Sequence, residues 1–216
     1  MAKTNVYNNF FDKSIWDEVN QDNKDLLEDF LLELRQNKKS EGTIYQYLSD
    51  LRGVFCFIIK NFDNRSILEL SKKEFRKFSI YLSEECKLSN ARHNRIMSSV
   101  RSMLNFAEEN DDDYDYLTNV ASKVKGLPKE SVREIFFLSD EQIMRLKDEL
   151  IRINEFQKAT LLMLSYDSCA RKNELYQVEK YSFYDKNKNN TNKVIGKRKK
   201  VFNLIYFSAT KECAEL

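Results

Sequence analysis

Residues that interrupt helices are scarce in this sequence. Its 216 residues include only 4 glycines and 1 proline, whereas charged residues make up 32% and hydrophobic residues 42%. In a helix interior, glycine costs roughly 1 kcal/mol relative to alanine and proline about 3 kcal/mol. A chain of this length and hydrophobic content can bury one large core or two small ones. We therefore expect a mainly helical protein of one or two domains.

The first half of the chain shows helical periodicity in four segments, in which apolar residues recur every three or four positions. One segment has a capping box, because Ser71 and Glu74 can each satisfy a free backbone N–H group of the first turn. The segments begin at Asn23, near Thr43, at Ser71, and at Ser89 or Asn90. Four amphipathic helices predict a compact bundle over residues 23–110. Residues 1–22 have no clear period and are predicted to form an N-terminal arm.

Residues 111–135 lose this periodicity. They include much of an acidic run, a glycine and the one proline of the chain, which interrupt regular structure. We interpret them as a linker, followed by a second domain over residues 136–216. This domain opens with a capping box of Ser139 and Gln142. The residues expected on the inner face of its first helix are Ile143, Leu146 and Leu150.

A cationic motif follows an apolar helical run in the second domain. The run Ala159–Tyr166 leads into the sequence S-C-A-R-K-N-E-L at residues 168–175. Arg171 and Glu174 stand three positions apart, so on a helix they would share a face. An arginine guanidinium can bind a phosphate through two parallel hydrogen bonds. The same pattern also occurs as an exposed pair that contributes almost nothing to stability, so the motif alone leaves both interpretations open.

A basic hairpin is predicted further along the chain. The sequence V-I-G-K at residues 194–197 is followed by three basic residues and then by the apolar run Val201–Phe207. This order indicates two strands around a tight turn, in which Gly196 permits an unusual backbone conformation and Lys197 lies at the tip. The alternative is a solvated basic turn without a binding role.

Charge and cysteine usage limit the classes of function. The formal net charge is only +2, so total charge does not argue for nucleic acid. The distribution of charge does argue for nucleic acid, because no acidic residue lies between Cys86 and Ala107 and the fourth helical segment is locally basic. With one histidine and four dispersed cysteines, we expect no metal site. No apolar run approaches the length of a membrane span, so we expect a soluble protein of the reducing cytoplasm.

Taken in order, these motifs resemble the tyrosine recombinase (phage integrase) family. That family has an R-x-x-E-L box after a buried helix and then a β-hairpin carrying V-x-G-K. The sequence S-E-G-T-I at residues 40–44 is similar to the second helix of the family's core-binding domain, and S-N-A-R at residues 89–92 to its fourth. The resemblance covers nearly the whole chain. It implies a helical, SAM-like core-binding domain followed by the first part of an α+β catalytic domain with a small antiparallel sheet.

The resemblance also implies roles for individual residues. Arg171 would bind the non-bridging oxygens of the scissile phosphate, Glu174 would orient it, and Lys197 would protonate the departing 5′-oxygen. Lys199 and Lys200 are rivals for that last role, because Arg198 stands where the family often has glycine. The residues expected to contact DNA are Thr43, Arg92, His93, Arg95, Arg101, Arg198, Lys199 and Lys200.

The function implied is site-specific recombination or integration of a mobile element. Such an enzyme breaks and rejoins duplex DNA through a 3′-phosphotyrosyl intermediate, with other recombinase subunits as partners and without a metal, nucleotide cofactor or small-molecule substrate. In the family an H-x-x-R box and the nucleophilic tyrosine follow the hairpin. This sequence ends at Leu216, and none of its 11 tyrosines has a matching context. We therefore expect the chain to bind DNA without cutting it.

Two alternatives remain open. The chain could be a non-catalytic remnant that occupies recombination sites or modulates a full-length recombinase. It could also be a helical protein–protein module, although that interpretation leaves the basic hairpin unexplained.

Overall fold

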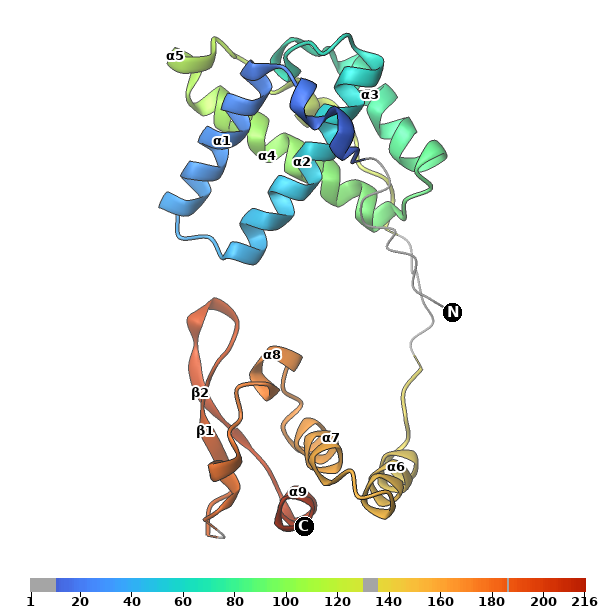
Figure 1. The fold of residues 1–216 in the computed structure, drawn as a ribbon, viewed down its shortest axis with the longest axis vertical. Coiled ribbons are helices and arrows are strands. Elements are labelled where there is room, and N and C mark those ends of the chain that lie inside the picture. The colour runs from blue at the N-terminus through green and yellow to red at the C-terminus, as the bar shows by residue number, and fades with distance from the viewer. Residues whose placement is uncertain (1–10, 130–135, 186) are drawn as a thin grey trace. The chain divides into compact units, whose positions relative to one another are not determined.

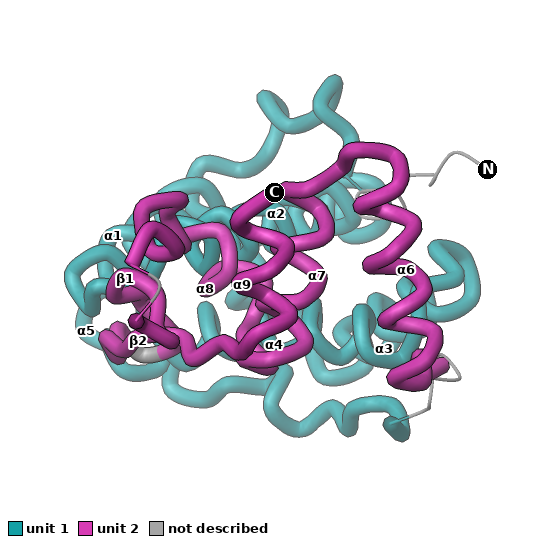
Figure 2. Tube along the Cα trace, turned by 90° about the horizontal axis from the view of Figure 1, so that it is seen from below, with its two compact units in different colours: residues 1–134 teal, residues 135–216 magenta. Residues whose placement is uncertain are grey.

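The computed structural model describes residues 11–129, 136–185 and 187–216. The chain divides into two compact units, Met1–Glu134 and Ile135–Leu216, coloured separately in Figure 2. Among the described residues, helices dominate and the strands form one two-stranded antiparallel sheet (Figure 1). This confirms the expected mainly helical fold with a small sheet.

Unit 1 is a helical bundle. The side chains of Ser40, Ser71 and Ser89 each accept a backbone N–H of the first turn that follows them, so all three helix starts are capped. The predicted capping box of Ser71 and Glu74 is present. The helices are α1 (Gln21–Gln36), α2 (Glu41–Asn61), α3 (Lys72–Ile80), α4 (Asn90–Glu109) and the short α5 (Asp111–Tyr114).

The core of unit 1 lies where α1, α2 and α4 pack together (Figure 1). Leu51 and Phe55 of α2 and Ile96 and Leu104 of α4 are fully buried. Burying a side chain of this size contributes roughly 1.5–3 kcal/mol. Burial of the apolar faces that the sequence predicted therefore stabilises the folded state of unit 1. In the part of the chain that the structure describes, no helix is both long and apolar enough to cross a membrane.

The predicted linker begins too early. Tyr116, Ala121 and Val124 are buried in the core of unit 1, and Val120–Lys123 forms a 3₁₀ turn. The segment packs through short turns rather than through a periodic helix, which is why its sequence lost the helical pattern. At the other end, Val19 also belongs to this core. The predicted N-terminal arm lies in part outside the described residues, namely over residues 1–10.

Unit 2 has three main helices and the sheet. Its α6 begins with the predicted capping box of Ser139 and Gln142. Leu146, which was expected on the inner face of this helix, is 41% exposed, so that prediction is wrong. The elements are α6 (Asp140–Arg152), α7 (Phe156–Ser168), α8 (Lys172–Leu175), β1 (Asn190–Ile195), β2 (Val201–Ile205) and α9 (Ser208–Glu215).

Polar contacts hold the elements of unit 2 in place. At the end of α7, a carboxylate oxygen of Asp167 accepts the backbone N–H of Phe207 at 2.9 Å and the hydroxyl of Thr210 at 2.6 Å, which fixes the start of α9. The buried Tyr206 donates its hydroxyl to the carbonyl of Ser182 at 3.0 Å. The strands pair with Val194 opposite Phe202.

Candidate phosphate pocket and DNA-binding surface

The arginine motif does not continue the helix before it. Helix α7 ends at Ser168, because Cys169 adopts a left-handed backbone conformation with φ 50°. Arg171 has an extended backbone (φ −73°, ψ 151°) and stands immediately before α8. Arg171 and Glu174 are therefore not paired across one face of a continuous helix, as the spacing indicated. They are paired by a capping arrangement at the start of a new helix.

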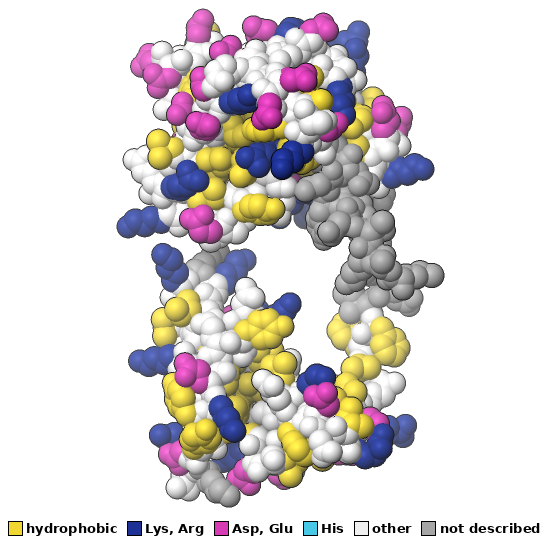
Figure 3. Space-filling view, viewed as in Figure 1, with side chains coloured by type: hydrophobic (Ala, Val, Ile, Leu, Met, Phe, Trp, Pro, Cys, Tyr) yellow, Lys and Arg dark blue, Asp and Glu magenta, His cyan; other side chains and the backbone are white. Residues whose placement is uncertain are grey.

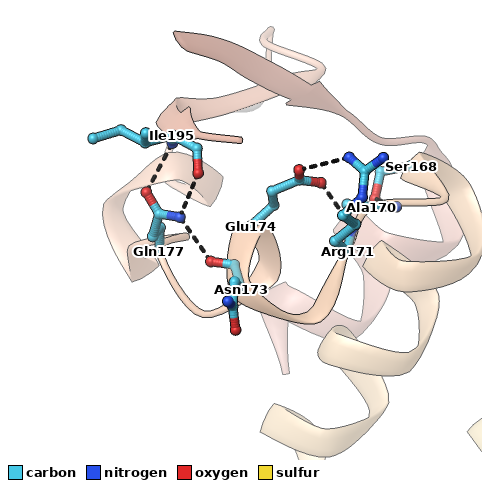
Figure 4. A network of polar contacts seen from close by, with 7 residues as sticks. All are labelled: Ser168, Ala170, Arg171, Asn173, Glu174, Gln177 and Ile195. Atoms are coloured by element: carbon cyan, nitrogen blue, oxygen red, sulfur yellow. Dashed lines mark hydrogen bonds and ion pairs between the residues drawn. The ribbon is translucent and has the colours of Figure 1, made fainter. Parts of the chain in front are cut away.

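Glu174 fixes Arg171 at two points. One carboxylate oxygen accepts the backbone N–H of Arg171 at 2.8 Å and the other accepts Nη1 of its guanidinium at 3.1 Å (Figure 4). The backbone hydrogen bond, then the side-chain bond and the charge of Arg171, hold the pKa of Glu174 below its usual value. The Glu174 side chain is 4% exposed and that of Arg171 is 70% exposed. The buried carboxylate thus orients a guanidinium whose remaining N–H groups face solvent.

Gly196 is the point at which the hairpin touches this pair. A Cβ at this position would lie 2.9 Å from Oε1 of Glu174 and 2.6 Å from Cε1 of Phe202, closer than side chains tolerate. The backbone of Gly196 is extended (φ −90°, ψ −170°), so the prediction that it adopts an unusual conformation is wrong. The residue with positive φ in the turn is Lys199 (φ 58°). Glycine is needed here for close approach.

The two motifs line one pocket of about 450 Å³. The structure therefore brings together Arg171, Glu174 and Lys197, which the sequence placed in separate motifs. Three cationic side chains border this space, which suits it to an anion with several oxygens. The lining residues are Arg171, Lys172, Asn173, Glu174, Ile195, Gly196 and Lys197.

The rival hairpin lysines are placed differently. Lys199 and Lys200 are exposed but are not among the residues that line the pocket. The side chain of Arg198 lies outside what the structure describes. Figure 3 shows basic side chains gathered around the tip of the hairpin, so this end of unit 2 is positively charged whichever lysine faces the pocket.

A buried aspartate that the sequence did not single out organises the basic face of unit 1. Asp50 of α2 is fully buried, and its carboxylate accepts Oγ of Ser99 at 2.9 Å and Nε2 of Gln46 at 3.1 Å. It lies 2.6 Å from Nη2 of Arg92 and 3.7 Å from Nε of Arg95. The signal available in the sequence was an aspartate on the apolar stripe of α2, where a charge requires a partner.

Asp50 contacts both arginines that were predicted to contact DNA, but the two arginines differ in exposure. The side chain of Arg92 is 13% exposed and that of Arg95 is 53% exposed. Arg92 therefore links α2 to α4, whereas Arg95 presents its charge to solvent. The spacing in the sequence gave both residues the same role.

Of two further predictions for this face, the one for His93 is contradicted by burial. His93 is fully buried and its Nε2 lies 2.8 Å from Oγ of Ser79, so it presents no surface to DNA. Burial lowers the pKa of His93 from its usual 6.5. Arg101 donates to the carbonyls of Ala121 at 3.3 Å and Val124 at 2.9 Å, and so holds the segment after α4 in place. Both residues take part in the packing of unit 1, and a contact between Arg101 and DNA stays a prediction.

Thr43 lies in the first turn of α2, half-buried, with its hydroxyl 2.9 Å from that of Ser40. It therefore takes part in the helix cap, and a contact between Thr43 and DNA stays a prediction. Among the described residues, no group of histidine, cysteine and acidic side chains is arranged to hold a metal ion.

Comparisons with known proteins agree with the family suggested by the motifs. Residues 27–110 match the phage integrase, N-terminal SAM-like domain. An SPbeta prophage-derived recombinase-like protein, YomM, of Bacillus subtilis (strain 168) is 21% identical over 171 residues, which cover 77% of this chain and 50% of that protein. The chain thus spans about half the length of this curated relative.

Among solved structures, a crystal structure of XerA recombinase aligns with 88% of this chain and 62% of its own length, at 15% identity. Its TM-score is 0.33, so the assignment does not depend on it. The domain match over the helical bundle and the recombinase-like relative both support the resemblance to the tyrosine recombinase (phage integrase) family that the motifs indicate.

Proposed function

We propose that the chain binds duplex DNA through unit 1 and the hairpin, and that the pocket of unit 2 holds a backbone phosphate during site-specific strand exchange. The observation that carries this proposal is the shared pocket of Arg171, Glu174 and Lys197. The relative is a prophage-derived recombinase-like protein, which supports a role in the recombination or integration of a mobile element. Other recombinase subunits bound to the same DNA, in the cytoplasm, are the proposed partners.

In this proposal Arg171 stabilises charge and Lys197 supplies a proton. The guanidinium, already oriented by Glu174, donates to the non-bridging oxygens as negative charge develops on them. One preorganised donor of this kind is typically worth about 3 kcal/mol in the transition state. The phenolate oxygen of a tyrosine, whose proton has passed to solvent, forms a bond to phosphorus. The bond from phosphorus to the 5′-oxygen breaks, and the Lys197 ammonium protonates that oxygen. One phosphodiester is exchanged for another, so no nucleotide hydrolysis is required.

The salt dependence of DNA affinity tests phosphate contact by the pocket. Each phosphate contact that is lost flattens the slope of log affinity against log salt by roughly 0.9. We expect this change in Arg171→Ala and in Lys197→Ala, measured by fluorescence anisotropy with a duplex of about 30 base pairs. The matched control is Lys180→Ala, which removes an exposed lysine that does not line the pocket. Unchanged slopes in both pocket variants would exclude phosphate binding there.

The non-catalytic alternative is supported by one feature of the pocket. Its seven lining residues provide cations and a carboxylate but no tyrosine. We therefore expect the 216-residue chain to bind a nicked suicide substrate, which traps covalent intermediates, without forming an adduct on a denaturing gel. An adduct that disappears when one tyrosine is changed to phenylalanine would show instead that the chain supplies its own nucleophile.

A further inference from the structure

Gln177 binds the end of strand β1 with its side chain. Its Nε2 donates to the carbonyl of Ile195 at 3.0 Å, and its Oε1 accepts the N–H of the same residue at 2.8 Å (Figure 4). The second hydrogen of Nε2 reaches the carbonyl of Asn173 at 2.7 Å. The orientation of the amide is fixed by these partners, because the nitrogen faces two carbonyls and the oxygen faces an N–H. All of its principal hydrogen-bonding groups are therefore used.

These two hydrogen bonds between Gln177 and Ile195 take the place of pairing with a neighbouring strand. Ile195 pairs with Val201 of β2 on one side, and its own N–H and C=O groups turn to Gln177 on the other. In antiparallel strands, a residue likewise uses its N–H and its C=O group to form two hydrogen bonds with one residue of the neighbouring strand. Ile195 directly precedes Gly196 and Lys197, so the side chain of Gln177 fixes the backbone from which the pocket lysine projects.

A second contact ties the same segments together. Nδ2 of Asn192, in β1, donates to the backbone carbonyl of Gln177 at 2.9 Å, while its Oδ1 accepts the N–H of Glu179 at 2.9 Å. The chain that follows α8 is thus attached to β1 at two points, at Asn192 and at Ile195. Arg171 and Glu174 lie within about two helical turns before Gln177, so this attachment joins the segment that carries Arg171 to the strand that leads to Lys197.

We propose that Gln177 is a positioning residue. It fixes the distance between Lys197 and Arg171, so that both side chains can bind the same tetrahedral oxyanion. This inference rests on the proposed phosphate-binding function of the pocket. Two cations on independent segments bind one anion well only if their spacing is fixed beforehand, because ordering them at the moment of binding costs free energy. Gly196 lets the hairpin approach Glu174 closely, and the hydrogen bonds from Gln177 hold the hairpin in that position.

The probe for this proposal is inorganic sulfate, which has the shape of phosphate and keeps its charge between pH 4 and pH 7. NMR would follow the side-chain signals of Arg171 and Lys197 during the titration. In the wild-type chain we expect sulfate to shift both. In Gln177→Ala we expect the shift of Lys197 to be lost and the affinity to fall about tenfold. Gln157→Ala is the matched control, since Gln157 is an exposed glutamine of the same unit.

Gln177→Glu provides a rescue that a merely structural role would not give. A protonated glutamic acid can donate to the carbonyl of Ile195 and accept its N–H, as glutamine does, whereas the carboxylate can no longer donate. The usual pKa of glutamate is about 4.3. We therefore expect this variant to resemble Gln177→Ala at pH 7 and to approach the wild type near pH 4, each compared with the wild type at the same pH.

Amide hydrogen exchange separates this inference from the proposed function. Loss of the clamp should accelerate exchange of the Ile195 amide about tenfold in Gln177→Ala, while the Leu204 amide, which is bonded to Oγ1 of Thr191, stays protected and reports an intact hairpin. Faster exchange at Ile195 with unchanged sulfate shifts at both cations would overturn the positioning role alone. Failure of sulfate to shift either cation in the wild type would overturn the phosphate pocket and, with it, the role assigned to Gln177.

Discussion

The two units reach a defined structure by different means. In unit 1, side chains from all the long helices and from the segment up to Val124 form one buried core. In unit 2, the contiguous core consists of Ala159, Met163 and Cys213 with partly buried neighbours, and hydrophobic side chains remain exposed along the hairpin (Figure 3). Hydrogen bonds from Asp167, Gln177 and other polar side chains place its elements. Unit 1 is held by burial, and unit 2 depends more on polar geometry.

The same contrast separates two acid–arginine pairs. Asp50 and Glu174 are both buried carboxylates that contact an arginine. Asp50 holds Arg92 in a nearly enclosed position between helices, whereas Glu174 holds Arg171 with 70% of its side chain exposed. The chemistry of the pair is the same, but the exposure of the guanidinium decides whether it stabilises the fold or can bind a ligand.

The largest effect that we expect is loss of core burial in unit 1. Phe55 is fully buried, so Phe55→Ala should lower the free energy of unfolding of this unit by about 3–5 kcal/mol. Trp16, the one tryptophan of the chain, packs against the same core, and its fluorescence during urea denaturation reports unit 1. Leu117→Ala is the control, because Leu117 of the same unit is 74% exposed and should change stability by less than about 0.5 kcal/mol. Equal costs would contradict the conclusion that burial holds unit 1 together.

A smaller effect is expected at the acid that joins α2 and α4. Asp50→Asn keeps the size of the side chain but removes the charge that Arg92 contacts, and hydrogen bonds to charged groups contribute about 1.5–3 kcal/mol. We expect a loss of that order, measured by the same fluorescence. Asp148→Asn, at a pair of unit 2 whose aspartate is 70% exposed, should have little effect on exchange of the Leu204 amide, which reports that unit. Stability unchanged in Asp50→Asn would mean that burial alone maintains unit 1.

Two glycine substitutions should change stability in opposite directions. At Gly196 a Cβ would meet Glu174 and Phe202, and overpacking of this kind costs about 1–3 kcal/mol. At Gly42, in the first turns of α2, a Cβ would have no atom within 4 Å, so Gly42→Ala should stabilise unit 1 by up to about 1 kcal/mol. Hydrogen exchange of the Leu204 and Leu104 amides would follow each unit. A neutral Gly196→Ala would show that the hairpin can move away from Glu174.

Sequence reasoning succeeded where periodicity and capping determine structure. The starts of α3, α4 and α6 followed from a serine before an apolar stripe, since these signals act within one turn. The start of α2 was placed near Thr43, whereas the helix begins at Glu41 with Ser40 as its cap. The linker was placed too early because residues 115–129 pack through short, irregular turns, whose burial depends on distant helices rather than on local pattern. Leu146 was misplaced because unit 2 gives α6 too little apolar surface to cover all of its stripe.

The candidate site could be predicted in its parts but not in its geometry. The identities of Arg171, Glu174 and Lys197 came from motifs, yet the break at Cys169 and the capping arrangement depend on tertiary context. The spacing of α4 could not show that Arg92 and His93 turn inward while Arg95 turns outward, because burial of a polar residue depends on its partners in other elements. Gln177 belongs to no motif, and Asp50 is marked in the sequence only as a charge on an apolar stripe, since their roles exist only through those partners.

The smallest effect concerns pH and again distinguishes the units. Burial lowers the pKa of His93 below its usual 6.5, so this imidazole binds a proton less readily in the folded state than in the unfolded chain. The unfolded chain then binds more protons than the folded one once the pH falls below about 6.5, and stability must decrease on that side. The stabilisation is fully present above pH 6.5 and is lost as the pH falls through the folded pKa. His93 is the one histidine of the chain, so unit 2 should show little pH dependence between pH 5 and 7.

Urea unfolding at several pH values, followed by Trp16 fluorescence for unit 1 and by the Leu204 amide for unit 2, would measure this difference. His93→Gln, which keeps a polar group near Ser79, should flatten the dependence of unit 1. A dependence that persists in this variant would assign the titration to a carboxylate instead.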